Sequence, residues 1–185
     1  STCERRLARF VRGNLLRPMK ILLENWKHFL NEAPEVVSTT MRVKKFGAFG
    51  GDGFMITLLG STEDGGSVAP GSMVVQEIAT YTSKDKFRKM PACREDLEKL
   101  KEMGYEAERF FYVDKARVGE GFRNQGFGKK LYNGAFEEMR KQIGQPFIIM
   151  PTWCLGAGGT SQAARRVWDS ITRDHISSGH VIYIP

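Results

Sequence analysis

The sequence VGEGFRNQGFG, Val118 to Gly128, joins an apolar run to a segment with helical periodicity. The run before it, 110–113, reads Phe-Phe-Tyr-Val, which is typical of a buried strand. The segment after it, 129–143, has apolar residues at 131, 132, 135, 136, 139 and 143, which form one stripe of a 3.6-residue helix. A strand therefore meets a helix through a glycine-rich turn. The free N–H groups and the dipole of the helix N-terminus predict an anion site there, most simply a phosphate site.

Two common phosphate-loop patterns do not fit this turn. The Walker pattern needs Lys directly after its second Gly, but Gly126 is followed by Phe127. The dinucleotide fingerprint needs a third Gly at position 124, which is Asn. The spacing that fits is V-x-x-x-x-R-x-x-G-x-G, formed by Val118, Arg123, Gly126 and Gly128.

This spacing resembles the acetyl-CoA signature of the GCN5-related N-acetyltransferase (GNAT) superfamily, and Phe122 and Leu131 fit the same pattern. The resemblance implies an enzyme that transfers an acetyl group from acetyl-CoA directly to a primary amine. It implies that the coenzyme A diphosphate binds to backbone N–H groups of the turn, at Arg123, Asn124, Gln125, Gly126, Phe127 and Gly128, with Lys129 adjacent. It also implies that the strand edge near Arg117 and Val118 pairs with the pantetheine amides. The alternative is a glycine-rich turn that binds nothing.

The order of predicted elements also resembles the GNAT arrangement, an α/β (α+β) fold with a mixed, mostly antiparallel sheet flanked by helices. We expect strands at 39–46, 53–59, 73–82, 109–118, 146–152 and 180–184, and helices at 4–12, 16–31, 94–103, 128–143 and 161–172. The strands 109–118 and 147–152 are expected to splay apart and admit the cofactor. The connections 47–53, 60–72, 84–92 and 156–159 are predicted loops that read the acceptor.

We expect one domain over residues 1–185, with a helical N-terminal region over about 1–33. Two departures from the resemblance stand out. A helix-containing insertion spans about 84–106, and the chain stops about one strand early, since the family usually closes with a hairpin. Either the missing strand comes from elsewhere, or the sequence is a domain of a longer protein.

Strand alternation suggests which side chains flank the reacting group. Residues 112, 114, 116 and 118 should share one face, which places Tyr112 and Asp114 beside Val118. In several GNAT members a carboxylate on this strand takes the amine proton. Asp114 is therefore the first candidate for the base and Glu77, on the preceding predicted strand, the second. The alternative is that each is an exposed strand carboxylate without a catalytic role.

A second GNAT motif, N-x-x-A-x-x-x-Y, falls on Ser161, Ala164 and Trp168. Ser161 is expected to cap the helix and, with Trp168, to contact the cofactor. Trp168 stands where the family has a tyrosine that protonates the departing thiolate, and an indole cannot do this because its N–H does not titrate. The remaining proton donors are water, Tyr132, Tyr183 and Cys154, unless the site is chemically impaired. Cys154 is alternatively a nucleophile or a buried structural thiol.

Composition limits the class and the partners. The formal net charge is +7 with pI ≈ 9.4, and residues 1–28 form a basic arm that suits a nucleic acid or an acidic partner, or is simply a solvated helix face. The three cysteines show no Cys-x-x-Cys pair, so we expect no metal site, no disulfide and a reducing, cytoplasmic compartment. No apolar run approaches the length of a membrane span. Two alternatives to an ordinary acetyltransferase stay open: a non-catalytic CoA-binding or partner-binding module, and an enzyme that acts on a nucleic-acid-linked amine such as aminoacyl-tRNA.

Overall fold

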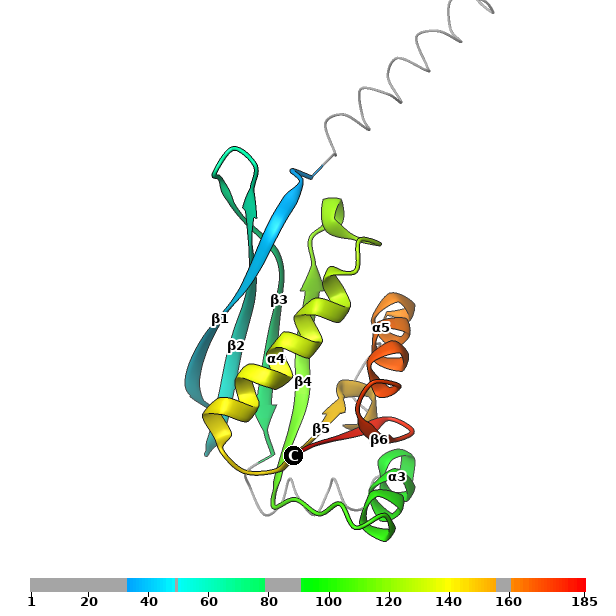
Figure 1. Cartoon of the computed structure of the whole chain (residues 1–185). Helices are drawn as coiled ribbons and strands as arrows, with labels where there is room; N and C mark the ends of the chain where they lie inside the picture. The colour runs from blue at the N-terminus through cyan, green and yellow to red at the C-terminus, as the bar shows by residue number, and fades with distance from the viewer. Residues whose placement is uncertain (1–32, 49, 79–90, 156–160) are drawn as a thin grey trace, which may run out of the picture. The chain divides into compact units, whose positions relative to one another are not determined.

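A computed structural model describes residues 33–48, 50–78, 91–155 and 161–185 (Figure 1). The chain divides between Pro34 and Glu35 into two compact units, and the description here concerns the second unit. The predicted helices at 4–12 and 16–31 and the basic arm lie outside the described residues, as do the loop 156–159 and most of 84–92.

One sheet runs through the described chain in the order β1-β2-β3-β4-β5-β7-β6. Its strands are β1 (Val36–Ala48), β2 (Gly51–Thr62), β3 (Ser67–Glu77), β4 (Arg109–Val118), β5 (Phe147–Pro151), β6 (Ile176–Ser178) and β7 (Val181–Ile184). The β4–β5 pair is parallel, and the other neighbouring pairs are antiparallel. The predicted mixed, mostly antiparallel sheet is confirmed.

The first three strands are longer than the sequence predicted. The expected loop at 60–72 is wrong, because β2 and β3 continue through most of it and turn over residues 63–66. Thr62 and Gly65 close this turn through bonds of 3.0 Å from Thr62 N to Gly66 O and from Gly65 N to Thr62 O. Gly65 adopts φ +80°, a conformation that glycine reaches without a steric penalty. The polar, glycine-rich composition therefore marked a hairpin rather than a long loop.

The sheet also ends with a hairpin, contrary to the expectation that the chain stops one strand early. The short strand β6 pairs with β7 through Ser178 and Val181, and Gly179 at φ +64° forms the turn between them. Three residues are too few to give a periodic signal, which explains why the sequence revealed β7 alone.

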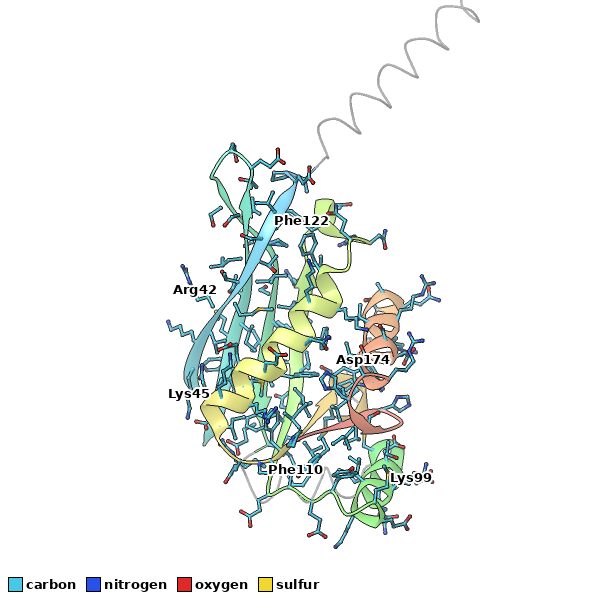
Figure 2. The ribbon with its side chains drawn as sticks, viewed as in Figure 1. Arg42, Lys45, Lys99, Phe110, Phe122 and Asp174 are labelled. Atoms are coloured by element: carbon cyan, nitrogen blue, oxygen red, sulfur yellow. A yellow bond between two sulfur atoms is a disulfide. The ribbon has the colours of Figure 1, made fainter. Side chains whose placement is uncertain are left out.

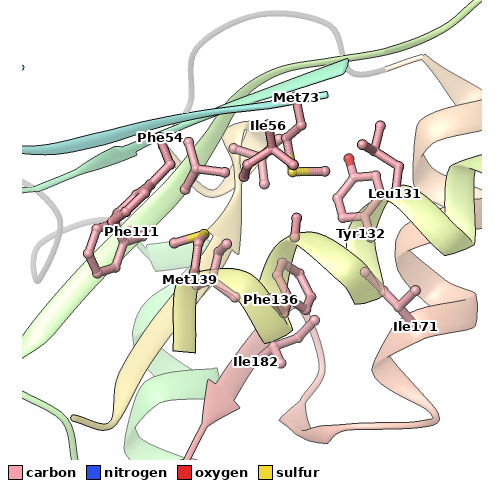
Figure 3. Packing of buried hydrophobic residues seen from close by; sticks show 14 of the residues in the cluster. Phe54, Ile56, Met73, Phe111, Leu131, Tyr132, Phe136, Met139, Ile171 and Ile182 are labelled. Atoms are coloured by element: carbon pink, nitrogen blue, oxygen red, sulfur yellow. The ribbon is translucent and has the colours of Figure 1, made fainter. Parts of the chain in front are cut away.

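Two layers of helices cover the sheet. The helices α4 (Phe127–Ile143) and α5 (Gln162–Thr172) pack on one face, where Phe111, Phe136 and Trp168 are fully buried. Figure 3 shows Phe136 of α4 and Ile171 of α5 in this core. The helix α3 (Pro91–Glu102) packs on the other face over β5 and β7, with Leu100 and Val181 in its core. Each large side chain buried in this way contributes about 2–3 kcal/mol. The predicted helices at 94–103, 128–143 and 161–172 are confirmed.

Candidate functional site

The parallel ladder of β4 and β5 ends at the carboxyl end of β5. Their pairing ends at Val113 and Pro151, after which β5 gives way to a 3₁₀ turn, Thr152–Leu155. The Thr152 hydroxyl donates to the Val113 carbonyl and ends the ladder there. Beyond this point, β4 continues to Val118 and is paired only with β3 in the described chain. From Asp114 onward the described chain therefore leaves the β5 side of β4 open, at the place where the splay of the central strands was predicted.

The signature turn, residues Val118–Gly128, leads from the splayed half of β4 into α4. Gly119 N anchors it to Pro70 O at 2.9 Å, and a short 3₁₀ helix, Glu120–Phe122, follows. The ring of Phe122, which is labelled in Figure 2, packs edge-on against Phe127 with the ring centroids 5.7 Å apart. These contacts fix the path of the chain into the helix.

The N-terminus of α4 presents free amides to this turn. Lys130 N makes the first helical bond, to Gly126 O at 3.1 Å, so the amides of 127–129 precede the helical ladder. Arg123, Asn124 and Gln125 are exposed beside them, and Gln125 Nε2 donates to Gly121 O at 2.9 Å. This arrangement has the geometry of an anion site. A pocket of about 620 Å³ opens next to it, lined by Thr39, Thr40, Met41, Leu58, Gly126, Lys129, Lys130, Asn133 and Gly134.

The two signature glycines serve different purposes. Gly126 caps α4 at φ +80°, and a Cβ there would meet nothing within 4 Å, so its backbone conformation requires glycine. Gly128 is required by packing, since a Cβ there would lie 3.0 Å from Val167 Cγ2 on α5. Helix–helix contact thus accounts for a glycine that the sequence assigned to diphosphate approach.

Lys129 has a partner within the protein. Its ammonium group forms an ion pair with Asp174, which follows α5, and this interaction lowers the pKa of the Asp174 carboxyl. If Lys129 binds a phosphate, as predicted, its ammonium group must either contact Asp174 at the same time or release it. Arg123 forms no ion pair in the described chain and is the freer cation at the turn.

A β-bulge in β4 corrects the predicted face of these side chains. Val75 pairs with Val113 and Val74 pairs with Lys115, so Asp114 is the extra residue. Before the bulge, Phe111 and Val113 face α4 and Tyr112 faces the α3 side, whereas after it Ala116 and Val118 face α4. The simple alternation of the sequence prediction is therefore wrong, and Tyr112 lies on the opposite face from Val118.

Tyr112 and Asp114 do lie together, through a residue that the sequence did not single out. Tyr112 Oη donates to Gln76 Oε1 at 2.8 Å, and Gln76 Nε2 lies 3.5 Å from Asp114 Oδ2. Burial and then the Asp114 charge raise the pKa of Tyr112. Gln76 carries no motif in the sequence, and only the strand register reveals it.

The structure places Glu77 away from this group. Its carboxylate binds Arg109 twice at 2.7 Å and accepts from Asp52 N at 2.9 Å, and Arg109 also reaches Asp52 at 2.6 Å. Burial by itself would raise the pKa of Glu77, but the bonds from Arg109 and Asp52 outweigh it and hold that pKa below its ordinary value. Glu77 pairs with Phe111, within the closed part of the β4–β5 ladder, so it does not join Asp114 at the splay.

Ser161 and Trp168, from the second motif, have structural roles. Ser161 Oγ accepts from Ala164 N at 3.2 Å and caps α5, as predicted. Trp168 is 1% exposed and donates its indole N–H to His180 O at 3.1 Å. Its predicted cofactor contact is therefore not available in this structure, because the side chain is a core residue with its donor already used.

Among the candidate proton donors, Tyr132 lies nearest to the expected position. Its ring packs edge-on against Trp168 at 5.9 Å, and Figure 3 shows its hydroxyl directed toward the strands. No described residue accepts a hydrogen bond from this hydroxyl. No polar side-chain atom of the described chain is both buried and without a hydrogen-bond partner, so the Tyr132 hydroxyl is accessible to solvent. Burial raises the pKa of Tyr132 to about 12. Tyr183 instead packs against Tyr105 on the α3 face.

The cysteines correct a further prediction. Cys93 and Cys154 form a disulfide that joins α3 to the 3₁₀ turn after β5, so Cys154 is neither a nucleophile nor a thiol donor. This bond also removes the reason for predicting a reducing, cytoplasmic compartment. In the described ranges, no helix is long and apolar enough to cross a membrane, and no cluster of three or more His, Cys, Asp or Glu residues is placed to hold a metal ion.

A scan against known protein families finds no match, and a search of curated proteins finds none either. One solved structure that the chain resembles is arylalkylamine N-acetyltransferase 2 from Aedes aegypti, at 17% identity and a TM-score of 0.37. The match covers 62% of this chain and 55% of that chain, so this chain spans little more than half of the length of the mosquito protein. A likeness of this degree carries no argument about chemistry, which has to come from the site itself.

Proposed function

We propose that the protein is an acetyl-CoA-dependent N-acetyltransferase that transfers its acetyl group directly to a primary amine. The observation that carries the proposal is the end of the β4–β5 ladder at Val113 and Pro151, which leaves the edge of β4 open up to the signature turn at the N-terminus of α4. In this proposal the diphosphate binds at the amides of 127–129 beside Arg123, and the pantetheine amides pair with the open edge of β4 near Arg117 and Val118.

The thioester would occupy the gap between the two strands. Asp114 lies at the start of that gap on the face opposite α4. In this proposal the Tyr132 hydroxyl, which points toward the strands, would reach the thioester from the α4 side. The amine nitrogen attacks the thioester carbon from the Asp114 side, Asp114 takes a proton from the nitrogen, and the carbon–sulfur bond breaks. Tyr112 and Gln76 hold the Asp114 carboxylate in place.

The high pKa of Tyr132 defines its part in this reaction. A thiol has a pKa of about 8.5, so proton transfer from a hydroxyl with a pKa of about 12 is uphill by roughly 5 kcal/mol. Tyr132 therefore donates a hydrogen bond to the departing sulfur, and the thiolate takes its proton from water. Tyr132, on α4, thus provides the hydroxyl that Trp168 lacks.

Thermal unfolding with acetyl-CoA, ATP or NAD tests the proposal. Stabilisation by acetyl-CoA and not by the other two is expected, because binding to the folded state alone raises the apparent stability. Release of free thiol in the presence of an amine panel then separates an enzyme from a non-catalytic CoA-binding module. Absence of any stabilisation by acetyl-CoA would contradict both the enzyme and the CoA-binding module.

A further inference from the structure

Two rows of side chains cross four strands on the sheet face opposite α4. Each row starts with a cation on β1 and ends with a cation on β4, with uncharged residues between them. The first row is Arg42, Thr57, Ser72 and Arg117, and the second is Lys44, Met55, Val74 and Lys115. We call them the basic rows.

The four cations of the basic rows are exposed and have no ion-pair partner among the described residues. Arg42, Lys44, Lys115 and Arg117 form no ion pair with any described residue, and Figure 2 shows Arg42 extending outward from β1. Lys45, the neighbour of Lys44 along β1, instead pairs with Asp52 at 2.9 Å. A row of cations without internal partners is available to an external anion.

The β4 bulge places the basic rows beside the proposed base. Lys115 follows Asp114 directly, and both lie on the face of Gln76 and Val74. An acceptor amine that reaches Asp114 from this face must therefore lie over the basic rows, which continue away from Asp114 toward Arg117 and Arg42.

We infer that the acceptor is an acidic peptide, bound in extended form over the basic rows with a primary amine at Asp114, an inference that rests on the proposed function. Cations two residues apart on a strand are about 6.7 Å apart, which matches acidic side chains at alternate positions of an extended peptide. The two cation columns are three strand spacings apart, about 14 Å, which leaves the uncharged strip for the peptide backbone.

The test compares two ten-residue peptides with free N-terminal amines and a C-terminal fluorophore. One has Glu at alternate positions and the other has Gln at the same positions. Fluorescence anisotropy at low salt is expected to show tighter binding of the Glu peptide, and kcat/KM should follow the same order. Arg42→Gln/Lys44→Gln should weaken Glu-peptide binding by about two- to thirtyfold, as expected for two exposed ion pairs. Lys115→Gln should weaken it as well.

Lys99→Gln/Lys101→Gln on α3 removes the same charge elsewhere and is the matched control. Equal binding of the two peptides, or an equal loss in this control, overturns the inference. So does tighter binding of a single-stranded oligonucleotide that is lost in the Arg42→Gln/Lys44→Gln variant, because the surface would then serve nucleic acid. Acetyl-CoA stabilisation is measured separately: its absence counts against the proposed function, whereas its presence without a Glu preference counts against the acidic acceptor alone.

Discussion

The rings of Tyr132 and Trp168 meet edge to face, with their centroids 5.9 Å apart and their planes at 81°. The two residues come from neighbouring helices, α4 and α5. The motif predicts one aromatic residue with a hydroxyl at position 168, whereas here the buried ring and the hydroxyl belong to two different residues. Trp168 fills the core and donates to His180 O, while Tyr132 keeps a hydroxyl without a partner in the described chain. The Tyr132 hydroxyl is therefore carried by the ring that packs against Trp168, the position where the motif has its tyrosine.

Replacement of Tyr132 by Phe tests this assignment. Loss of a hydrogen bond to a developing thiolate removes about 1.5–3 kcal/mol, so kcat should fall by about ten- to a hundredfold. Acetyl-CoA stabilisation should be unchanged, since the phenyl ring preserves the contact with Trp168. Tyr183→Phe, which removes a hydroxyl on the α3 face of the sheet, is the matched control and should leave kcat unchanged. An unchanged kcat in Tyr132→Phe would exclude this role.

The Asp114 carboxylate should be essential for turnover. Asp114→Asn keeps the shape and the bulge but cannot accept the amine proton, so kcat/KM should fall by about 10²- to 10⁴-fold. Glu120→Gln removes an exposed carboxylate from the signature turn and should leave turnover within a few-fold of the wild type. If both variants keep full activity, another group or water serves as the base.

The contact between Gly128 and Val167 predicts a coupled pair of substitutions. Gly128→Ala places a methyl group 3.0 Å from Val167 Cγ2, and such overpacking costs about 1–3 kcal/mol of unfolding free energy. Val167→Ala should recover part of that loss in the double variant. Gly126→Ala should cost about 1–2 kcal/mol for its left-handed backbone, with no relief from Val167→Ala. Chemical denaturation of the wild type and the five variants gives the coupling, and simple additivity at 128 and 167 would contradict the packing explanation.

The Cys93–Cys154 disulfide should stabilise the fold without contributing to the site. It closes a sequence separation of 61 residues, for which chain entropy predicts about 4 kcal/mol. Reduction, or the variant Cys93→Ala/Cys154→Ala, should lower the unfolding free energy by an amount of that order. Peptide mapping without reductant should recover the two cysteines linked, and free thiols at both positions would contradict the bond.

Much of the fold could be predicted from local periodicity. The stripe 131–143 predicted α4, and the apolar run before the turn predicted β4. The open edge of β4 beyond β5 was expected from the resemblance to the GNAT arrangement. These features depend on residues close together in the sequence. The short strand β6 and the hairpin of β2 and β3 depend on pairing partners, which local composition does not encode.

The site was less predictable because non-local contacts assign its residues. A single bulged residue, Asp114, reversed the parity of β4, and no pattern in the sequence marks it. Gln76 joined the site through strand register, Glu77 left it through Arg109, and Gly128 was explained by Val167 on another helix. Spacing identified the turn, but packing between distant segments decided what each side chain is free to do.

Calorimetric titration of acetyl-CoA into matched glycine variants tests the central claim most directly. Gly126 and Gly144 cap the two ends of α4 with left-handed backbones, φ +80° and +68°, so an Asp at either position introduces similar strain and the same charge. Gly126→Asp should abolish binding, because its carboxylate meets the diphosphate at the helix N-terminus, and Gly144→Asp should bind as the wild type does. Equal binding by the two variants would contradict a cofactor site at the signature turn.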